Sequence, residues 1–264
     1  MSTGPTGCAR VLGRLRDLYR WKRWGLLGPL PLLGENEVAR IKSAIRAQRS
    51  RSGVSATRNR HIDLPVLDGL CADEGFWRAI HDVLGRELVL WRTNMFLADP
   101  RLPWHEDRHS EAFEGDALSF STLLAMDDLP EQSCTMFVPG SHRLTVPEKE
   151  RRYGISAAYR KSGNIRYAGQ VAEKFHEPVP LRAGEAVLFH PHLLHASGSY
   201  ARDRRSTSRE RMILTFRITT PAAELRDGAF PEASEGGDKG LRFLSRSSGT
   251  ASWSNVLTPS SRYS

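Results

Sequence analysis

Two residues that can bind a metal ion stand two positions apart in the segment Trp104-His105-Glu106-Asp107. If this segment is extended, the side chains of His105 and Asp107 point to the same side, because side chains two apart share a face of a strand. One imidazole and one carboxylate can then bind one metal ion from a single strand. This two-residue pattern is also common on protein surfaces, so by itself it is weak evidence for a metal site. A metal site would require a third ligand from elsewhere in the chain.

The best candidate for the third ligand is His195, which lies 88 residues after Asp107. It ends the segment His190-Pro191-His192-Leu193-Leu194-His195, after a turn at Gly184 and an apolar stretch that reads as a strand. Two histidines and one carboxylate on one face of an octahedron suit a non-heme Fe(II) oxygenase, with open positions for a co-substrate and dioxygen. The same ligand types would also serve a zinc hydrolase that activates a bound water.

An arginine at the start of a later strand could bind an anionic co-substrate. In Arg211-Met212-Ile213-Leu214-Thr215-Phe216-Arg217 the residue types alternate, which predicts that Arg211 and Arg217 share one face with Ile213 and Thr215. An arginine inside a barrel is costly unless it meets an anion. Because a guanidinium binds a carboxylate through two hydrogen bonds, a dicarboxylate is a reasonable partner.

Four segments taken together in this order resemble the phytanoyl-CoA dioxygenase-like family of Fe(II)- and 2-oxoglutarate-dependent oxygenases. The resemblance covers roughly residues 25 to 220, and the segment from Trp24 to Leu30 is similar to the family's first strand. The four segments are His105-x-Asp107, Phe137-Val138-Pro139-Gly140-Ser141-His142, Ala183-Gly184-Glu185-Ala186-Val187-Leu188-Phe189-His190 and His195-Ala196-Ser197-Gly198.

This resemblance implies roles for individual residues. His105, Asp107 and His195 would bind Fe(II), Arg211 would bind the distal carboxylate of 2-oxoglutarate, and Ser197 would help to bind it. The family usually places its arginine closer behind the second histidine than the 16 residues found here, so Arg209 is a rival with the same strand parity. Halogenases of this family lack the carboxylate ligand, so Asp107 favours hydroxylation or a related oxidation such as desaturation or ring closure.

The elements that must position these residues are mainly short strands. We expect strands at 87–97, 117–126, 135–138, 178–190 and 211–219, and helices starting near Asn36 and Asp73. Short strands behind a small helical layer predict an all-β core with flanking helices. The family resemblance implies that this core is a double-stranded β-helix, a cupin-like jelly roll.

The chain divides into three parts by composition. Residues 1–23 form a basic N-terminal lead-in, residues 24–220 the predicted dioxygenase domain, and residues 221–264 a tail rich in Ser and Gly that is either mobile or held down by a few apolar residues. Inside the domain, residues 143–177 are polar and interpreted as a long loop. We expect its part from about Val146 to Val171 to act as a lid, with Gly154 and Gly163 as hinges and with arginines for anionic groups.

Composition excludes some classes of protein. The 264 residues are 39% hydrophobic, which is enough for a core, and no apolar run is long enough to span a membrane. Three separated cysteines make neither a disulfide framework nor a zinc pattern, so we expect a cytoplasmic protein. The short apolar runs predict no membrane partner, and the oxygenase resemblance implies a small-molecule substrate. The oligomeric state is left open.

Two other functions stay open at this point. A net charge of +8 and the Arg211–Arg217 spacing also fit a nucleic-acid dealkylase of the same superfamily, although we see no base-flipping signature and expect no nucleic-acid partner. A non-catalytic, cupin-like binding protein is the remaining alternative. Among the readings, oxidation of a small polar metabolite in a bacterial biosynthetic pathway, such as antibiotic tailoring, accounts for most of these features.

Overall fold

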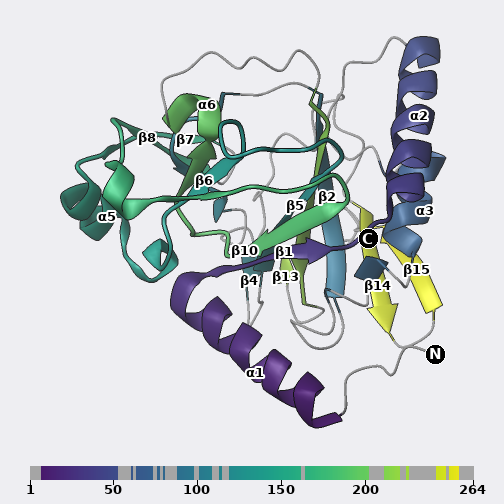
Figure 1. Cartoon of the computed structure of the whole chain (residues 1–264), viewed down its shortest axis with the longest axis horizontal. Coiled ribbons are helices and arrows are strands. Elements are labelled where there is room, and N and C mark those ends of the chain that lie inside the picture. The colour runs from purple at the N-terminus through teal and green to yellow at the C-terminus, as the bar shows by residue number, and fades with distance from the viewer. Residues whose placement is uncertain are drawn as a thin grey trace, which may run out of the picture.

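The structure is a computed structural model of the 264-residue chain. It describes residues 7–52, 61, 64–73, 76–77, 80, 88–97, 101–108, 113–114, 119–161, 164–201, 211–220, 224–225, 242–247 and 250–255. Helices lie around a core of two antiparallel β-sheets that face each other (Figure 1). The predicted all-β core with flanking helices is confirmed.

The larger sheet has the strand order β1-β10-β5-β12-β2-β14-β15. These strands are β1 (Leu26–Pro31), β10 (Glu185–Phe189), β5 (Ser119–Ala125), β12 (Ile213–Thr219), β2 (Leu88–Phe96), β14 (Arg242–Ser247) and β15 (Thr250–Asn255). The smaller sheet has the order β7-β8-β3-β11-β6-β9. Its strands are β7 (Ser156–Lys161), β8 (Asn164–Ala168), β3 (His105–Glu106), β11 (His195–Ser197), β6 (Thr135–Phe137) and β9 (Glu177–Val179). A separate pair joins β13 (Glu224–Leu225) to β4 (Phe113–Glu114).

Residue alternation along the central strands separates two hydrophobic layers. On β5, Leu124 belongs to the layer that packs under the helices, whereas its neighbour Leu123 belongs to the layer between the sheets. On β12, Leu214 and Ile213 divide in the same way. The predicted shared face of Ile213, Thr215 and Arg217 therefore points into the space between the sheets, where the candidate site lies.

Two helices cover the outer face of the larger sheet. They are α2 (Glu35–Ser52) and α3 (Pro65–Ala72), and Ile41 and Ile45 of α2 are buried at helical spacing. The helix predicted near Asn36 is thus confirmed. The sequence did not predict α3, but Phe76, Trp77 and Ile80 are helical and buried, as expected for a helix after Asp73.

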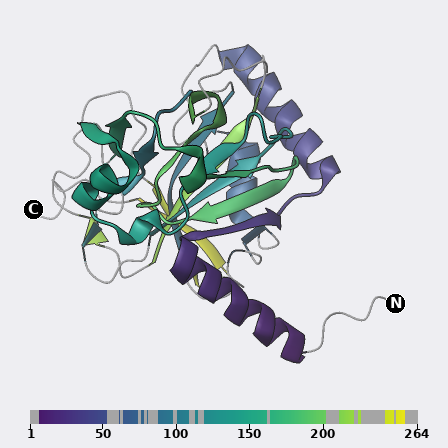
Figure 2. The ribbon, with the colours of Figure 1, turned by 60° about the vertical axis from the view of Figure 1, so that its left-hand side comes forward.

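The basic lead-in is a helix, α1 (Gly7–Trp24), which projects from the core in Figure 2. Its last turn contacts the larger sheet, since the ring centroids of Trp21 and Phe120 are 5.3 Å apart. The chain then enters β1, which pairs with β10 and confirms the expected first strand. The turn before β10 needs Gly184, because it has φ 90° and a Cβ there would lie 2.3 Å from the carbonyl oxygen of Leu33.

The segment 143–177 is not a long loop, so that interpretation is wrong. It contains α5 (Val146–Tyr153), the hairpin of β7 and β8, and a short 3₁₀ helix, η4 (Glu173–Phe175). A capping box between Thr145 and Glu148 begins α5, and Gly154 ends it with φ 66°. The segment escaped prediction because only β7 is an edge strand, and β8 beside it alternates buried Ile165 and Tyr167 with exposed residues over only five positions.

The remaining elements complete the two sheets. A 3₁₀ helix, η3 (Ser141–Arg143), follows the Pro139-Gly140 turn, and α6 (Gly198–Ala201) follows β11. In the tail, β14 pairs with both β2 and β15, so its described part extends the larger sheet. No helix among the described residues is both long and apolar enough to cross a membrane.

Candidate metal centre

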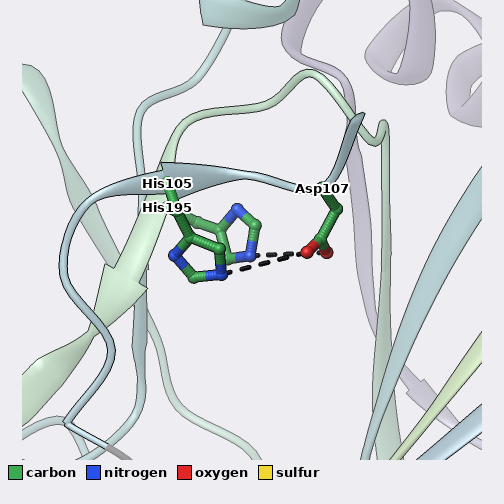
Figure 3. Close-up of side chains that lie close together, drawn as sticks. All are labelled: His105, Asp107 and His195. Carbon is green, nitrogen blue, oxygen red and sulfur yellow. Dashed lines mark ion pairs between the residues drawn. The ribbon is translucent and has the colours of Figure 1, made fainter. Parts of the chain in front are cut away.

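His105, Asp107 and His195 come together between the sheets, with their ligand atoms all within 4.8 Å of one another. In Figure 3 both imidazole rings point toward the carboxylate of Asp107. The Nε2 atoms of His105 and His195 lie 3.9 Å and 3.6 Å from the oxygens of this carboxylate. All three side chains are buried. The arrangement of the predicted triad can therefore hold one metal ion.

Backbone pairing between two segments sets this geometry. On the smaller sheet His195 of β11 stands directly opposite His105 of β3, and directly opposed residues share a face. The backbone N–H of Asp107 donates to the carbonyl of Pro191 at 2.8 Å. Residues 105–107 and 191–195 thus meet at two points, which brings ligands 88 residues apart in the sequence into one cluster.

Hydrogen bonds fix which ring nitrogen faces the site. Nδ1 of His105 lies 2.7 Å from the carbonyl oxygen of Pro103, and Nδ1 of His195 lies 2.8 Å from that of Leu193. Since a carbonyl oxygen only accepts, each Nδ1 carries the proton and donates it. Each Nε2 therefore presents its lone pair toward Asp107, which is the tautomer that a metal ion needs.

Both imidazoles are neutral near pH 7. Burial lowers the pKa of His195 to about 3, and the neighbouring His105 adds to this shift although Asp107 opposes it. Burial also lowers the pKa of His105 against the opposing effect of Asp107. Two neutral nitrogen donors and one carboxylate match the ligand set of non-heme Fe(II) sites.

Arg217, which the sequence analysis did not assign to the site, binds the carboxylate of the triad. Its Nη2 lies 2.6 Å from Oδ2 of Asp107, and the Ser121 hydroxyl lies 3.4 Å from the same oxygen. Strand parity predicted that Arg217 faces inward, but its partner could be found only from the register of β12 beside β5. Through this contact Arg217 holds one oxygen of Asp107 and orients the carboxylate within the triad.

The same arginine also offers donors to a ligand. Nε and Nη1 of Arg217 are buried and make no hydrogen bond to any residue that the structure describes. Arg92 lies directly opposite Arg217 on β2 and is buried too. Buried N–H groups without an acceptor are costly, so this positively charged wall fits an anionic group such as a 2-oxo acid.

Arg211 and Ser197 lie at one end of the barrel, near the start of β6. Arg211 is buried and its guanidinium donates to the carbonyl of Ser133. Ser197 pairs with Thr135, and the next residue, Gly198, approaches the carbonyl of Cys134 so closely that a Cβ would lie 2.4 Å from it. Both predicted 2-oxoglutarate residues thus neighbour the stretch 133–135. The rival Arg209 lies outside the described residues.

Aromatic rings border the triad on one side. The ring of Phe189 is 4.9 Å from that of His195, and Phe137 stacks on His195 at 5.7 Å. Both phenylalanines are buried, and the Arg217 guanidinium lies 6.0 Å from the Phe189 ring. This side therefore keeps water from the ligand atoms and strengthens the electrostatic interactions among them.

Comparisons with known proteins agree with this geometry. A family model described as phytanoyl-CoA dioxygenase matches residues 21–206. No curated protein matches the sequence at the level required for a significant relative.

Solved structures share the fold at low sequence identity. The epimerase SnoN, in complex with Fe3+, alpha-ketoglutarate (2-oxoglutarate) and nogalamycin RO, is 19% identical with a TM-score of 0.63, over 86% of this chain and 93% of that one. The carbocyclase SnoK from nogalamycin biosynthesis is 19% identical with a TM-score of 0.61, over 84% and 93%. CytC3 with Fe(II) and alpha-ketoglutarate is 21% identical with a TM-score of 0.56, over 84% and 82%.

Proposed function

The chain belongs to the phytanoyl-CoA dioxygenase family of non-heme iron, 2-oxoglutarate-dependent oxygenases, and on this premise we propose that it oxidises a small polar metabolite that carries an anionic group. The observation that carries the proposal is the buried His105, Asp107, His195 triad beside a wall of arginines. We place the reaction in a bacterial biosynthetic pathway of the kind that tailors antibiotics. SnoN and SnoK, of similar fold, come from nogalamycin biosynthesis and support this placement.

His105, Asp107 and His195 would hold the iron. Arg211 and Ser197 would bind the distal carboxylate of 2-oxoglutarate, and Arg217 offers two more N–H donors beside the triad. When bound, iron and 2-oxoglutarate use dioxygen to supply an oxidant strong enough to attack a C–H bond. The protein's residues keep the histidines in the correct tautomer, hold one oxygen of Asp107 and exclude water with Phe137 and Phe189.

Arg166 supports an anionic substrate. It lies on β8 directly opposite His105, so its side chain shares the face of the sheet that carries the triad. Unlike His105 it is exposed, and its positive charge contributes to lowering the pKa of His105. An exposed cation next to a buried metal ligand is well placed to attract a carboxylate or phosphate at the entrance of the site.

We propose that the substrate is hydroxylated, or that it undergoes desaturation or ring closure, which would use the same active-site residues. The presence of Asp107 as a third protein ligand supports these oxidations over halogenation. We also propose a cytoplasmic location, because three cysteines far apart in the sequence do not form the disulfide framework typical of secreted proteins.

The test measures how much succinate the Fe(II)-loaded protein forms from 2-oxoglutarate when a small metabolite is added. The metabolites are tested in pairs, in which one member carries a carboxylate or phosphate and the other is its neutral analogue. The anionic member of each pair should stimulate turnover more than the neutral one. Arg166→Gln should remove this preference, whereas Arg151→Gln, an exposed arginine on α5, should keep it. Equal stimulation by both members, or no effect of Arg166→Gln on the preference, would refute an anion-binding role for Arg166.

A further inference from the structure

A buried ion pair lies on the opposite face of β3 from the triad. Glu106 stands between His105 and Asp107 in the sequence, so its side chain points away from them. Its Oε2 lies 2.8 Å from Nζ of Lys149 on α5, and both side chains are 0% exposed. A fully buried lysine and glutamate are rare, because removing two charges from water is expensive.

The ammonium of Lys149 makes a second contact that reaches the other ligand segment. Its Nζ donates to the carbonyl of His192 at 2.9 Å, in the turn that leads to His195. One ammonium therefore bridges the segment 105–107, which carries His105 and Asp107, and the turn that leads to His195. These two segments supply all three members of the triad. The contacts of Lys149 add to the two backbone contacts between the segments, the Asp107–Pro191 hydrogen bond and the pairing of His195 with His105.

Two further donors complete the environment of Glu106. The Tyr167 hydroxyl on β8 donates to Oε1, and Nε of Arg108 lies 2.9 Å from Oε2. With donors on both oxygens, the carboxylate has a single orientation. Well-packed apolar residues usually stabilise a core as well as a buried ion pair does, so stability alone is a poor reason for this network.

We propose that Lys149 is a positioning residue of the metal centre. It acts through Glu106 and the His192 carbonyl, and it fixes the separation between residues 105–107 and His195. Helix α5 belongs to the metal centre on this account and does not move as part of a lid. The inference rests on the proposed function, because it takes His105, Asp107 and His195 as the iron ligands.

The experiment compares two lysine variants, Lys149→Met and Lys42→Met. Lys42 on α2 is a matched control, since it also forms an ion pair, with Asp127, but on the outer side of the larger sheet. The Fe(II) dissociation constant is measured anaerobically for each folded apoprotein, together with the visible absorption band after 2-oxoglutarate is added. Lys149→Met should weaken Fe(II) binding by about 10- to 100-fold and shift the band, as changes next to metal ligands do. Lys42→Met should match the wild type in both measurements.

A second variant covers the case in which Lys149→Met fails to fold. The double change Glu106→Gln with Lys149→Met removes both fully buried charges. The other cation on Glu106, Arg108, has a side chain that is 14% exposed and can be hydrated, so the double variant should fold. It still lacks the bridge and should lose Fe(II) affinity as well. Wild-type affinity in a folded Lys149 variant, single or double, overturns the proposal, as does an equal loss in Lys42→Met. Failure of the wild-type protein to bind Fe(II) at all would instead refute the ligand assignment.

Discussion

Each member of the triad is oriented by a specific neighbour at the scale of single residues. The two imidazoles donate their Nδ1 protons to backbone carbonyls of Pro103 and Leu193. One oxygen of Asp107 forms an ion pair with Nη2 of Arg217. Such partners keep ligands in place before the metal ion arrives, and they account for much of the affinity of metal sites.

Arg217 should matter to the stability of the apoprotein. Arg217→Met leaves the carboxylate of Asp107 buried without its closest cation, so the free energy of unfolding should fall by about 3–5 kcal/mol, as for other broken buried pairs. Urea denaturation of the metal-free protein measures this change. Arg217→Lys keeps a positive charge, so its free energy of unfolding should fall by less than that of Arg217→Met. An unfolding curve of Arg217→Met that overlays the wild-type curve would contradict the account.

Arg211 should determine the requirement for 2-oxoglutarate. Arg211→Gln removes a buried guanidinium from the end of the barrel that also holds Ser197, and losing such a charge pair costs about 2–5 kcal/mol of binding. The apparent Kd for 2-oxoglutarate should therefore rise by orders of magnitude, while Fe(II) binding changes little. Arg209→Gln is the comparison, since a large effect there and none at Arg211 would move the role to Arg209.

At the scale of elements, the junction of α1 with the core depends on two neutral histidines. The rings of His142 of η3 and His190 after β10 are tilted by 38° with centroids 5.0 Å apart, and the Trp21 ring of α1 lies 6.2 Å from the His190 ring. Nδ1 of His190 accepts the backbone N–H of His192 at 3.0 Å, which only the ring without a proton on Nδ1 can do. Burial lowers the pKa of His142 to about 4 and that of His190 to about 3.

These pKa values predict acid sensitivity of the fold. Because both are lower than the ordinary histidine value of 6.5, the unfolded chain binds more protons than the folded one, and stability falls as pH drops below about 6.5. The loss should level off near pH 4 to 3. Urea midpoints of the metal-free protein across this range should decline less steeply after His142→Gln and His190→Gln together. A slope equal to that of the wild type would exclude these histidines as the cause.

The segment 143–177 shows why some elements could not be predicted from the sequence. Its strands are short, β7 lies at the sheet edge, and β8 buries only Ile165 and Tyr167, so the pattern was that of a loop. The importance of Lys149 was also invisible, since a lysine 43 residues from Glu106 gives no sign that it is buried against it. The lid function remains a prediction. It now applies only to parts of the segment that can move while Lys149 and Tyr167 stay in contact with Glu106.

At the scale of the whole molecule, the sequence predicted most of the fold and the central triad. The H-x-D spacing is local, and strand parity places both side chains on one face without any knowledge of the rest of the chain. The assignment of His195 and the jelly-roll fold class were supported by motifs in a fixed order. The contact of Arg217 with Asp107 needed the register of β12 beside β5 and the way the two sheets face each other, which no local pattern encodes.

The central claim is that the three residues of the triad bind iron together with 2-oxoglutarate. Its most direct test is an anaerobic Fe(II) titration of the purified protein, followed by addition of 2-oxoglutarate, with metal content and visible absorbance recorded. The wild type should bind about one Fe(II) per chain and develop a weak visible charge-transfer band, and His105→Ala and His195→Ala should each lose both, because two remaining ligands hold iron poorly. Unchanged Fe(II) affinity in both variants would contradict the account.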